Sequence, residues 1–196
     1  MDRQNLSIDG ALAQAREIYA QGNPESRTLH ERALIPLPGG NTRTTLHFDP
    51  FPLVITRGAG ARVWDADGHE YADFIGEYTA GLYGHSHPVI RAAINSVLDD
   101  GHVLCAPNVY EQELATMMCD RFPCVEQVRF TNSGTEANLM IVGAARHFTG
   151  RDSVLVFKGG YHGAVFLFAG EPSPINAPFP FVIGAFNDVD ATRKQI

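Results

Sequence analysis

The residues with the clearest chemical potential lie in the run Phe130-Thr131-Asn132-Ser133-Gly134-Thr135-Glu136-Ala137-Asn138. A strand is predicted to end at Phe130 and a helix to begin a few residues later. The free N–H groups and the positive dipole end of a helix start can bind a phosphate. Ser133 and Thr135 add hydroxyl donors, and Gly134 lets an anion approach the main chain. A well-capped helix with a glutamate in its first turn would explain the same residues without a ligand.

A second run of interest is Lys158-Gly159-Gly160-Tyr161-His162-Gly163, directly after a predicted strand over residues 154–157. In parallel sheets the carboxyl ends of the strands face the ligand crevice, so both glycine-containing loops are expected on the same side. The ring of Tyr161 could lie flat against a planar cofactor. The alternative is a loop tyrosine that covers the core. Together the two loops favour a planar ligand that carries a phosphate.

The elements that must position these loops follow from the periodicity of apolar residues and from turn residues. Three strands, separated by glycines and by the turn Asp65-Ala66-Asp67-Gly68, are predicted to form an antiparallel meander. The later alternation of helices and strands indicates βαβ units around a mainly parallel sheet, and thus an α/β fold. We predict helices over residues 11–20, 23–36, 88–101, 110–122 and 135–148, and strands over residues 53–56, 61–65, 70–74, 125–130, 154–157 and 181–186.

The composition excludes several classes of function. The 196 residues carry a formal charge of -7, which argues against a nucleic-acid-binding surface and a polybasic membrane patch. The start, Met1 to Gly10, lacks the apolar region of a signal peptide, and no apolar run is long enough to span a bilayer. Three cysteines form no disulfide or zinc pattern, which favours a reducing cytoplasm. His85-Ser86-His87 has no evident third ligand, so we predict no metal site.

Four motifs carry a resemblance to a known family. They are the two runs above, Trp64-Asp65-Ala66-Asp67-Gly68 and Gly84-His85-Ser86-His87-Pro88. From about Leu37 to its last residue, the chain resembles the class III aminotransferases, the group of ω-transaminases and glutamate-1-semialdehyde aminomutases. The resemblance implies the fold type I of enzymes that use pyridoxal 5′-phosphate (PLP), with PLP as cofactor. It also implies amino acid and ketoacid substrates and a homodimer. Residues 1–74 would then contribute helices and the meander to the small domain, and residues 75–196 the first half of the large PLP-binding domain.

The resemblance also implies roles for single residues. The turn Ser133-Gly134-Thr135 matches the family's phosphate-binding turn. Tyr161 matches the aromatic residue that stacks on the pyridine ring, and His162 lies beside it.

A subgroup that acts on β-amino acids, the β-phenylalanine aminotransferases, is similar in two further stretches. Their pattern around a substrate arginine resembles Pro38 to Arg43, and their Glu-Tyr-Thr-Ala-Gly resembles Glu77 to Gly81. A planar guanidinium pairs bidentately with a carboxylate, so Arg43 suits an amino acid substrate, although a solvated loop arginine is the alternative. Tyr78 would line the substrate pocket or, alternatively, belong to the core.

The end of the chain determines what we expect of its activity. Asn187-Asp188-Val189-Asp190 predicts an N-cap for a helix that Ile196 leaves unfinished, which we interpret as a truncated reading frame or a fragment. In the family, the catalytic lysine and the acid that pairs with the pyridine nitrogen both lie beyond this region. We therefore nominate neither Lys158 nor Lys194 as catalytic, and we expect no activity and weak PLP binding from the chain alone. Three interpretations stay open: a transaminase fragment, an aminomutase-type isomerase and a non-catalytic fragment.

Overall fold

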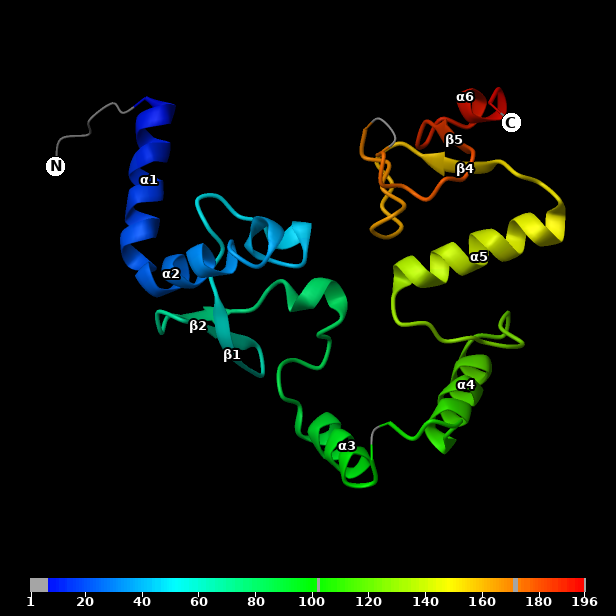
Figure 1. Cartoon of the computed structure of the whole chain (residues 1–196), viewed down its shortest axis with the longest axis horizontal. Helices are drawn as coiled ribbons and strands as arrows, with labels where there is room; N and C mark the ends of the chain where they lie inside the picture. Colours follow the sequence, from blue (N-terminus) through cyan, green and yellow to red (C-terminus); the bar gives the residue numbers. More distant parts are fainter. Residues whose placement is uncertain (1–6, 102, 171–172, 196) are drawn as a thin grey trace. The chain divides into compact units, whose positions relative to one another are not determined.

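The computed structural model describes residues 7–101, 103–170 and 173–195, apart from the side chain of Thr44. The chain consists of two compact units, Met1–Leu104 and Cys105–Ile196, and each contains its own sheet (Figure 1). The predicted division after residue 74 concerns the domains of a complete protein and stays a prediction. In the described part of the chain, no helix combines the length and the apolar character needed to cross a membrane.

Two helices open the first unit, as predicted. α1 (Ile8–Gly22) begins after Ser7, whose hydroxyl accepts a hydrogen bond from the amide of Gly10 at 3.2 Å. α2 (Pro24–Ala33) begins with a proline at its first position. Asn23 precedes it as predicted, but its side chain donates to the carbonyl of Tyr19 and makes no capping bond. The cap comes instead from the carboxylate of Asp67, which lies in the turn between the second and third strands.

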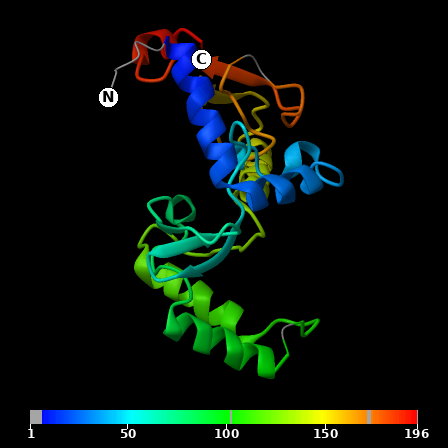
Figure 2. The same cartoon turned by 90° about the vertical axis from the view of Figure 1, so that its left-hand side faces the viewer.

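The predicted antiparallel meander is confirmed. It contains β1 (Ile55–Ala59), β2 (Arg62–Asp65) and β3 (Glu70–Ala72) in that order, and Figure 2 shows β1 and β2 as a twisted hairpin. The turn between β2 and β3 holds Asp67, whose two carboxylate oxygens accept from the amides of Glu25 and Ser26 at 2.7 and 3.0 Å. A loop of the sheet therefore provides the N-terminal cap of α2.

A buried carboxylate stabilises the same turn from inside. Asp65 is 2% exposed and accepts hydrogen bonds from the amide of His69 at 2.8 Å and from the hydroxyl of Tyr71 at 2.7 Å. The oxygen that accepts from Tyr71 also lies 2.9 Å from Nδ1 of His69. Burial raises the pKa of Asp65, but the hydrogen bonds from Tyr71 and His69 outweigh burial and leave the pKa below its ordinary value. The Trp-Asp-Ala-Asp-Gly motif is thus a folding element in this unit.

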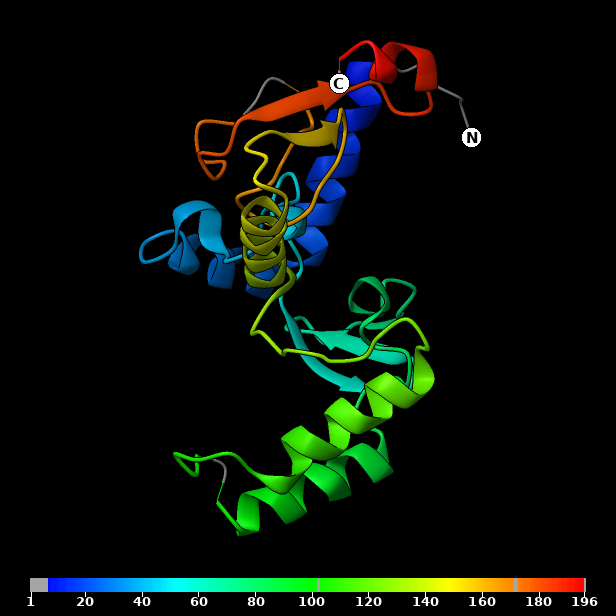
Figure 3. The same cartoon turned by 90° about the vertical axis from the view of Figure 1, so that its right-hand side faces the viewer.

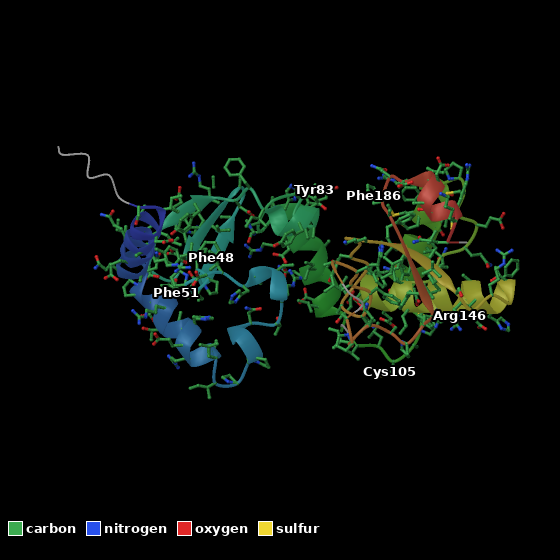
Figure 4. The ribbon with its side chains drawn as sticks, turned by 90° about the horizontal axis from the view of Figure 1, so that it is seen from above. Phe48, Phe51, Tyr83, Cys105, Arg146 and Phe186 are labelled. Carbon is green, nitrogen blue, oxygen red and sulfur yellow. The ribbon has the colours of Figure 1, made fainter. Side chains whose placement is uncertain are left out.

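The first unit is completed by aromatic packing and short turns. The ring of Tyr19 lies 5.0 Å from that of Phe51 and 5.9 Å from that of Phe48, both labelled in Figure 4. The loop segments form three 3₁₀ turns, η1 (Pro38–Gly40), η2 (Thr44–Leu46) and η3 (Gly76–Thr79), and α3 (Pro88–Asp99) follows.

The second unit contains the parallel strands. α4 (Val109–Arg121) and α5 (Gly134–Thr149) precede β4 (Val154–Phe157), and β5 (Phe181–Gly184) and α6 (Val189–Arg193) follow. β4 and β5 pair in parallel, with Val154 opposite Phe181, and Figure 3 shows both arrows pointing the same way. Val156 of β4 forms the buried core together with Phe166 and Phe168 from the segment between the two strands. The expected N-cap of α6 is confirmed, since the carboxylate of Asp188 accepts from the amide of Ala191.

The strand predicted over residues 125–130 is wrong for this structure. The segment follows α4 and is drawn without an arrow in Figure 1. Its one hydrogen bond to α4 runs from the thiol of Cys119 to the carbonyl of Glu126 at 3.5 Å. A strand requires a partner for its ladder, and no described strand pairs with this segment. The parallel sheet of the described residues therefore has two strands.

Candidate functional site

The start of α5 is locally well capped. The hydroxyl of Ser133 accepts a hydrogen bond from the amide of Glu136 at 3.1 Å. The carboxylate of Glu136 turns back and accepts from the amide of Asn132 at 2.9 Å. These two bonds resemble a capping box, in which a helix-start hydroxyl and a glutamate three residues later each accept from a main-chain amide. The helix start thus forms without any ligand.

Capping leaves donors for a ligand at the same helix start. The amides of Gly134 and Thr135 are the first two of the 16-residue helix, and neither finds an acceptor among the residues that the structure describes. Apart from Gly134 itself, its chain neighbours and the nearby backbone of α5, no atom lies within 4 Å of the point where a side chain on Gly134 would begin. The helix start therefore offers two amides, an open approach and the positive end of the helix dipole to an anion.

The second predicted loop lies directly against this helix start. The Thr135 hydroxyl accepts a hydrogen bond from the amide of Ala164 at 3.0 Å. One turn further along α5, the side-chain amide of Asn138 donates to the carbonyl of His162 at 2.8 Å. Gly163 lies between these contacts, and a Cβ atom there would be 2.4 Å from Oγ1 of Thr135. The structure thus brings the Ser133–Thr135 turn and the Tyr161–His162 loop together.

The loop itself is held by main-chain hydrogen bonds to the core. The amide of Gly159 donates to the carbonyl of Phe168 at 2.7 Å, and the amide of Phe168 donates to Gly160 at 2.9 Å. The amide of His162 donates to Phe166, and its ring lies 6.4 Å from that of Phe168. Phe166 and Phe168 are buried, whereas the side chain of Tyr161 is 67% exposed. The loop therefore exposes the Tyr161 ring to solvent, while the residues that follow it, 162–164, contact the start of α5.

The two residues predicted for substrate binding lie in the first unit. The main-chain amide of Arg43 donates to the side chain of Asn41 at 2.9 Å, and its guanidinium forms an ion pair with Glu77. The hydroxyl of Tyr78 donates to the carbonyl of Thr45 at 3.4 Å. The Arg43 and Glu77 side chains are 54% and 55% exposed. Arg43 and Tyr78 thus come from two segments of this unit that contact each other.

The turn that carries Tyr78 has an unusual backbone. Glu77, Tyr78 and Thr79 have φ angles of 49°, 54° and 81°, in the left-handed region that side chains disfavour. Asp73 holds the start of the turn, because its carboxylate accepts from the amides of Ile75 and Gly76 at 2.9 and 3.0 Å.

Asp73 also contacts His85, one of the two histidines in the His85-Ser86-His87 run that was considered for a metal site. Its second oxygen lies 2.8 Å from Nε2 of His85. The amide of Gly76 and the ring of His85 together lower the pKa of Asp73. Within the described ranges, no three His, Cys, Asp or Glu side chains are grouped to hold a metal ion. His85 therefore acts as a partner of Asp73 in the loop before α3.

Three residues of these clusters were not singled out from the sequence. Asn138 and Gly163 close the two motif runs, and their contacts become visible only when α5 and the loop pack together. Glu77 opens the Glu-Tyr-Thr-Ala-Gly stretch, but nothing in its sequence position indicates that it pairs with Arg43.

Comparisons with known proteins identify the family of the chain. Residues 45–190 match the family model described as aminotransferase class III. A β-phenylalanine transaminase from Variovorax paradoxus is 52% identical over 192 residues, which are 98% of this chain and 44% of that protein. A glutamate-1-semialdehyde 2,1-aminomutase from Haloquadratum walsbyi is 43% identical over 165 residues, 83% of this chain and 37% of that protein.

Solved structures give the same result for the fold. The crystal structure of a β-phenylalanine aminotransferase from Variovorax paradoxus superposes with a TM-score of 0.94 and 52% identity, over 97% of this chain and 44% of that one. An omega-transaminase from Sphaerobacter thermophilus gives 0.79 and 40%, over 88% of this chain and 44% of that one. The chain thus spans less than half the length of these relatives. Because the family model matches well over half of its residues, the chain belongs to the class III aminotransferase family.

Proposed function

We propose that this chain provides the phosphate-binding turn and the ring-facing loop of a PLP-dependent transaminase, which transfers an amino group between an amino acid and a ketoacid. The observation that carries the proposal is the contact of Thr135 with Ala164 and Gly163, which joins the two loops. The family and the similarity to a β-phenylalanine transaminase support the same reaction and favour a β-amino acid as substrate.

The donors at the start of α5 fit the phosphate of PLP. The amides of Gly134 and Thr135 and the hydroxyls of Ser133 and Thr135 are proposed to bind its oxygens. Glu136 directs its carboxylate at the amide of Asn132, so its charge is already held by a main-chain donor. When bound, the cofactor supplies an electron sink for the bond that breaks at the substrate carbon.

The other assigned side chains are proposed to orient the two bound molecules. Tyr161 lies against the cofactor ring and excludes water from that face, with His162 beside it. Arg43 binds the carboxylate of the substrate, and Tyr78 contacts the substrate body. None of these residues is assigned a proton-transfer step.

Two properties of the complete protein belong to the same proposal. A homodimer is what the family resemblance implies. A reducing, cytoplasmic setting fits three cysteines that are free thiols, namely Cys105, Cys119 and Cys124.

A second candidate reaction is favoured by a specific observation. Several relatives are glutamate-1-semialdehyde aminomutases, among them one that is 43% identical over 83% of this chain. Such an isomerase would keep the amino group within one substrate while using the same phosphate turn and ring-facing loop. An assay of a full-length protein containing this sequence, with β-phenylalanine and with glutamate-1-semialdehyde, separates the two reactions. Turnover of β-phenylalanine supports the transaminase, and turnover of the semialdehyde alone overturns it.

Cofactor binding by this chain can be tested without chemistry. Pyridoxine 5′-phosphate carries the ring and phosphate of PLP but no aldehyde, so it cannot bond to Lys158 or Lys194. In equilibrium dialysis, the chain should bind this compound and discriminate against pyridoxine, which lacks the phosphate. Thr135→Val removes one proposed phosphate donor and also the acceptor of the Ala164 amide, so it should weaken binding of the phosphorylated ligand more than binding of pyridoxine. Equal binding of both ligands would overturn the proposed phosphate site.

A further inference from the structure

Among the described residues of the first unit, the guanidinium of Arg43 pairs with one carboxylate, that of Glu77. Only one of its terminal nitrogens contacts Glu77, through a single carboxylate oxygen. A guanidinium has five N–H donors, arranged to bind both oxygens of a carboxylate at once. The Arg43 side chain is 54% exposed, and no other hydrogen bond of its guanidinium is found among the described residues. Glu77 thus uses only part of the hydrogen-bonding capacity of the Arg43 guanidinium.

Other bonds hold the η3 turn that carries Glu77. Asp73 accepts from the amides of Ile75 and Gly76, and the Tyr78 hydroxyl donates to the carbonyl of Thr45. The turn therefore has three ties besides the ion pair, so the loss of the Glu77 charge leaves it anchored on both sides.

The backbone of the η3 turn has an unusual conformation for a surface loop. Glu77, Tyr78 and Thr79 are three consecutive residues with side chains in the left-handed region. Such conformations are unfavourable and persist where the surroundings hold them, often at ligand-binding segments. The backbone that carries Glu77 is therefore held by its surroundings in a conformation that side chains disfavour, and from this backbone the Glu77 carboxylate pairs with Arg43.

We propose that Glu77 is an internal competitor that occupies Arg43 in place of a ligand carboxylate, and that a carboxylate ligand displaces it on binding. The inference rests on the proposed function, because it takes Arg43 to be the carboxylate-binding residue. A bidentate ligand makes two charge-assisted hydrogen bonds where Glu77 makes one, which gives the direction of the exchange. A ligand carboxylate must therefore bind more favourably than Glu77 in order to pair with Arg43. This competition favours ligands that make further contacts with the protein.

The test measures carboxylate binding to the full chain by NMR titration. The probe is 3-phenylpropanoate, which has a carboxylate and no amino group, and its uncharged counterpart is 3-phenylpropanamide. Glu77→Gln keeps the size of the side chain and removes the competing charge. Exposed ion pairs contribute up to about 1 kcal/mol, so this variant should bind 3-phenylpropanoate about threefold to fivefold more tightly. The amide probe should bind the two proteins equally.

A matched control accounts for the general loss of one negative charge. Glu31 forms an exposed ion pair with Arg27 in the same unit, with side chains 59% and 57% exposed. Glu31→Gln should leave the affinity for 3-phenylpropanoate unchanged. Glu77→Asp keeps the charge on a shorter side chain and should lie between the wild type and Glu77→Gln. Circular dichroism of each variant checks that the fold is retained.

The outcomes separate this inference from the proposed function. If Arg43→Ala abolishes binding while Glu77→Gln binds no more tightly than the wild type, Arg43 keeps its role and the competition is refuted. If Arg43→Ala binds the probe as well as the wild type does, both the competition and the role of Arg43 are refuted. Tighter binding in both Glu77→Gln and Glu31→Gln would attribute the effect to net charge and would also refute the competition.

Discussion

The hydroxyl of Thr135 accepts a hydrogen bond from the main-chain amide of Ala164, 29 residues further along the chain. This bond ties the start of α5 to the loop after β4. It makes the orientation of the Thr135 hydroxyl dependent on the loop, because the oxygen accepts from Ala164 and its proton is left to donate elsewhere. The binding of a ligand at the helix start should therefore depend on the position of the loop that carries Tyr161.

We expect Gly163→Ala to disrupt this contact. The new methyl group would lie 2.4 Å from Oγ1 and 2.7 Å from Cα of Thr135, and the residue has a φ angle of +121°. Steric overlap in a packed region costs about 1–3 kcal/mol, to which the backbone strain is added. Urea denaturation of the variant should show this loss, and binding of pyridoxine 5′-phosphate should weaken with it.

Gly159→Ala separates backbone strain from steric overlap. Gly159 also has a positive φ angle, +87°, but beyond its two chain neighbours no residue has an atom within 4 Å of the point where a side chain would begin. This variant should lose about 1–2 kcal/mol from backbone strain alone and should keep the Thr135–Ala164 bond. Equal losses in the two variants would show that the packing of Gly163 on Thr135 contributes nothing.

Ser133→Ala tests whether the helix cap and the ligand site are the same group. The substitution removes the hydroxyl that accepts from the amide of Glu136, so the free energy of unfolding should fall by about 1 kcal/mol. Asn108→Ala removes the equivalent cap of α4, where the side chain accepts from Glu111 at 3.1 Å. Both variants should lose similar stability, but only Ser133→Ala should bind pyridoxine 5′-phosphate more weakly in equilibrium dialysis. Weaker binding in both would attribute the effect to lost stability.

Capping residues in the sequence correctly predicted where α5 and α6 begin. The Ser-Gly-Thr-Glu run predicts a helix with a phosphate-sized group of donors, and the structure caps α5 with Ser133 and Glu136. Asp188 likewise caps α6 as its position indicates. These features depend on residues within one turn of each other, and single-sequence reasoning can see such distances.

Features that join distant segments could not be predicted in the same way. The cap of α2 comes from Asp67, 42 residues after Glu25, and not from Asn23 next to the helix. The partner of Arg43 is Glu77, 34 residues away. The segment over residues 125–130 contains Val125, Val128 and Phe130, residue types that favour strands, but a ladder also depends on a neighbouring strand, which its own residues do not encode.

The buried carboxylate of Asp65 should contribute to the acid stability of the first unit, as should Asp67 and Asp73, whose pKa values are also lowered. Its pKa is lowered in the fold, so its charged form adds stability above the unfolded pKa of about 4, and this stability is lost as pH falls through the folded pKa. Asp65→Asn turns one acceptor into a donor facing Tyr71 or His69, which should cost about 1–3 kcal/mol at neutral pH.

The pH dependence provides the decisive comparison for Asp65. Thermal unfolding of the wild type should weaken more steeply below about pH 4 than that of Asp65→Asn, because the variant has no carboxyl group to protonate there. Asp99→Asn, at the exposed end of α3, should change stability by less than about 0.5 kcal/mol and keep the wild-type acid profile. Identical acid profiles for the wild type and Asp65→Asn would exclude Asp65 as the responsible group.

The exposed ring of Tyr161 should contribute to cofactor binding through its face and not through its hydroxyl. Its backbone is fixed by the hydrogen bonds of Gly160 and His162 to the buried residues Phe168 and Phe166, so the ring is presented from a rigid loop. Stacking of aromatic rings contributes about 0.5–1.5 kcal/mol, so Tyr161→Ala should weaken binding of pyridoxine 5′-phosphate by about twofold to tenfold. Tyr161→Phe keeps the ring and should bind as the wild type does.

Phe148 provides the control for Tyr161, because its ring is 91% exposed at the far end of α5. Phe148→Ala removes a solvent-exposed ring from the same unit without touching either loop, so its affinity for the cofactor analogue should not change. If Tyr161→Phe loses as much affinity as Tyr161→Ala, the hydroxyl makes the contact and the stacking argument fails. If neither variant loses affinity, the ring does not meet the ligand, and the phosphate turn alone would have to account for binding.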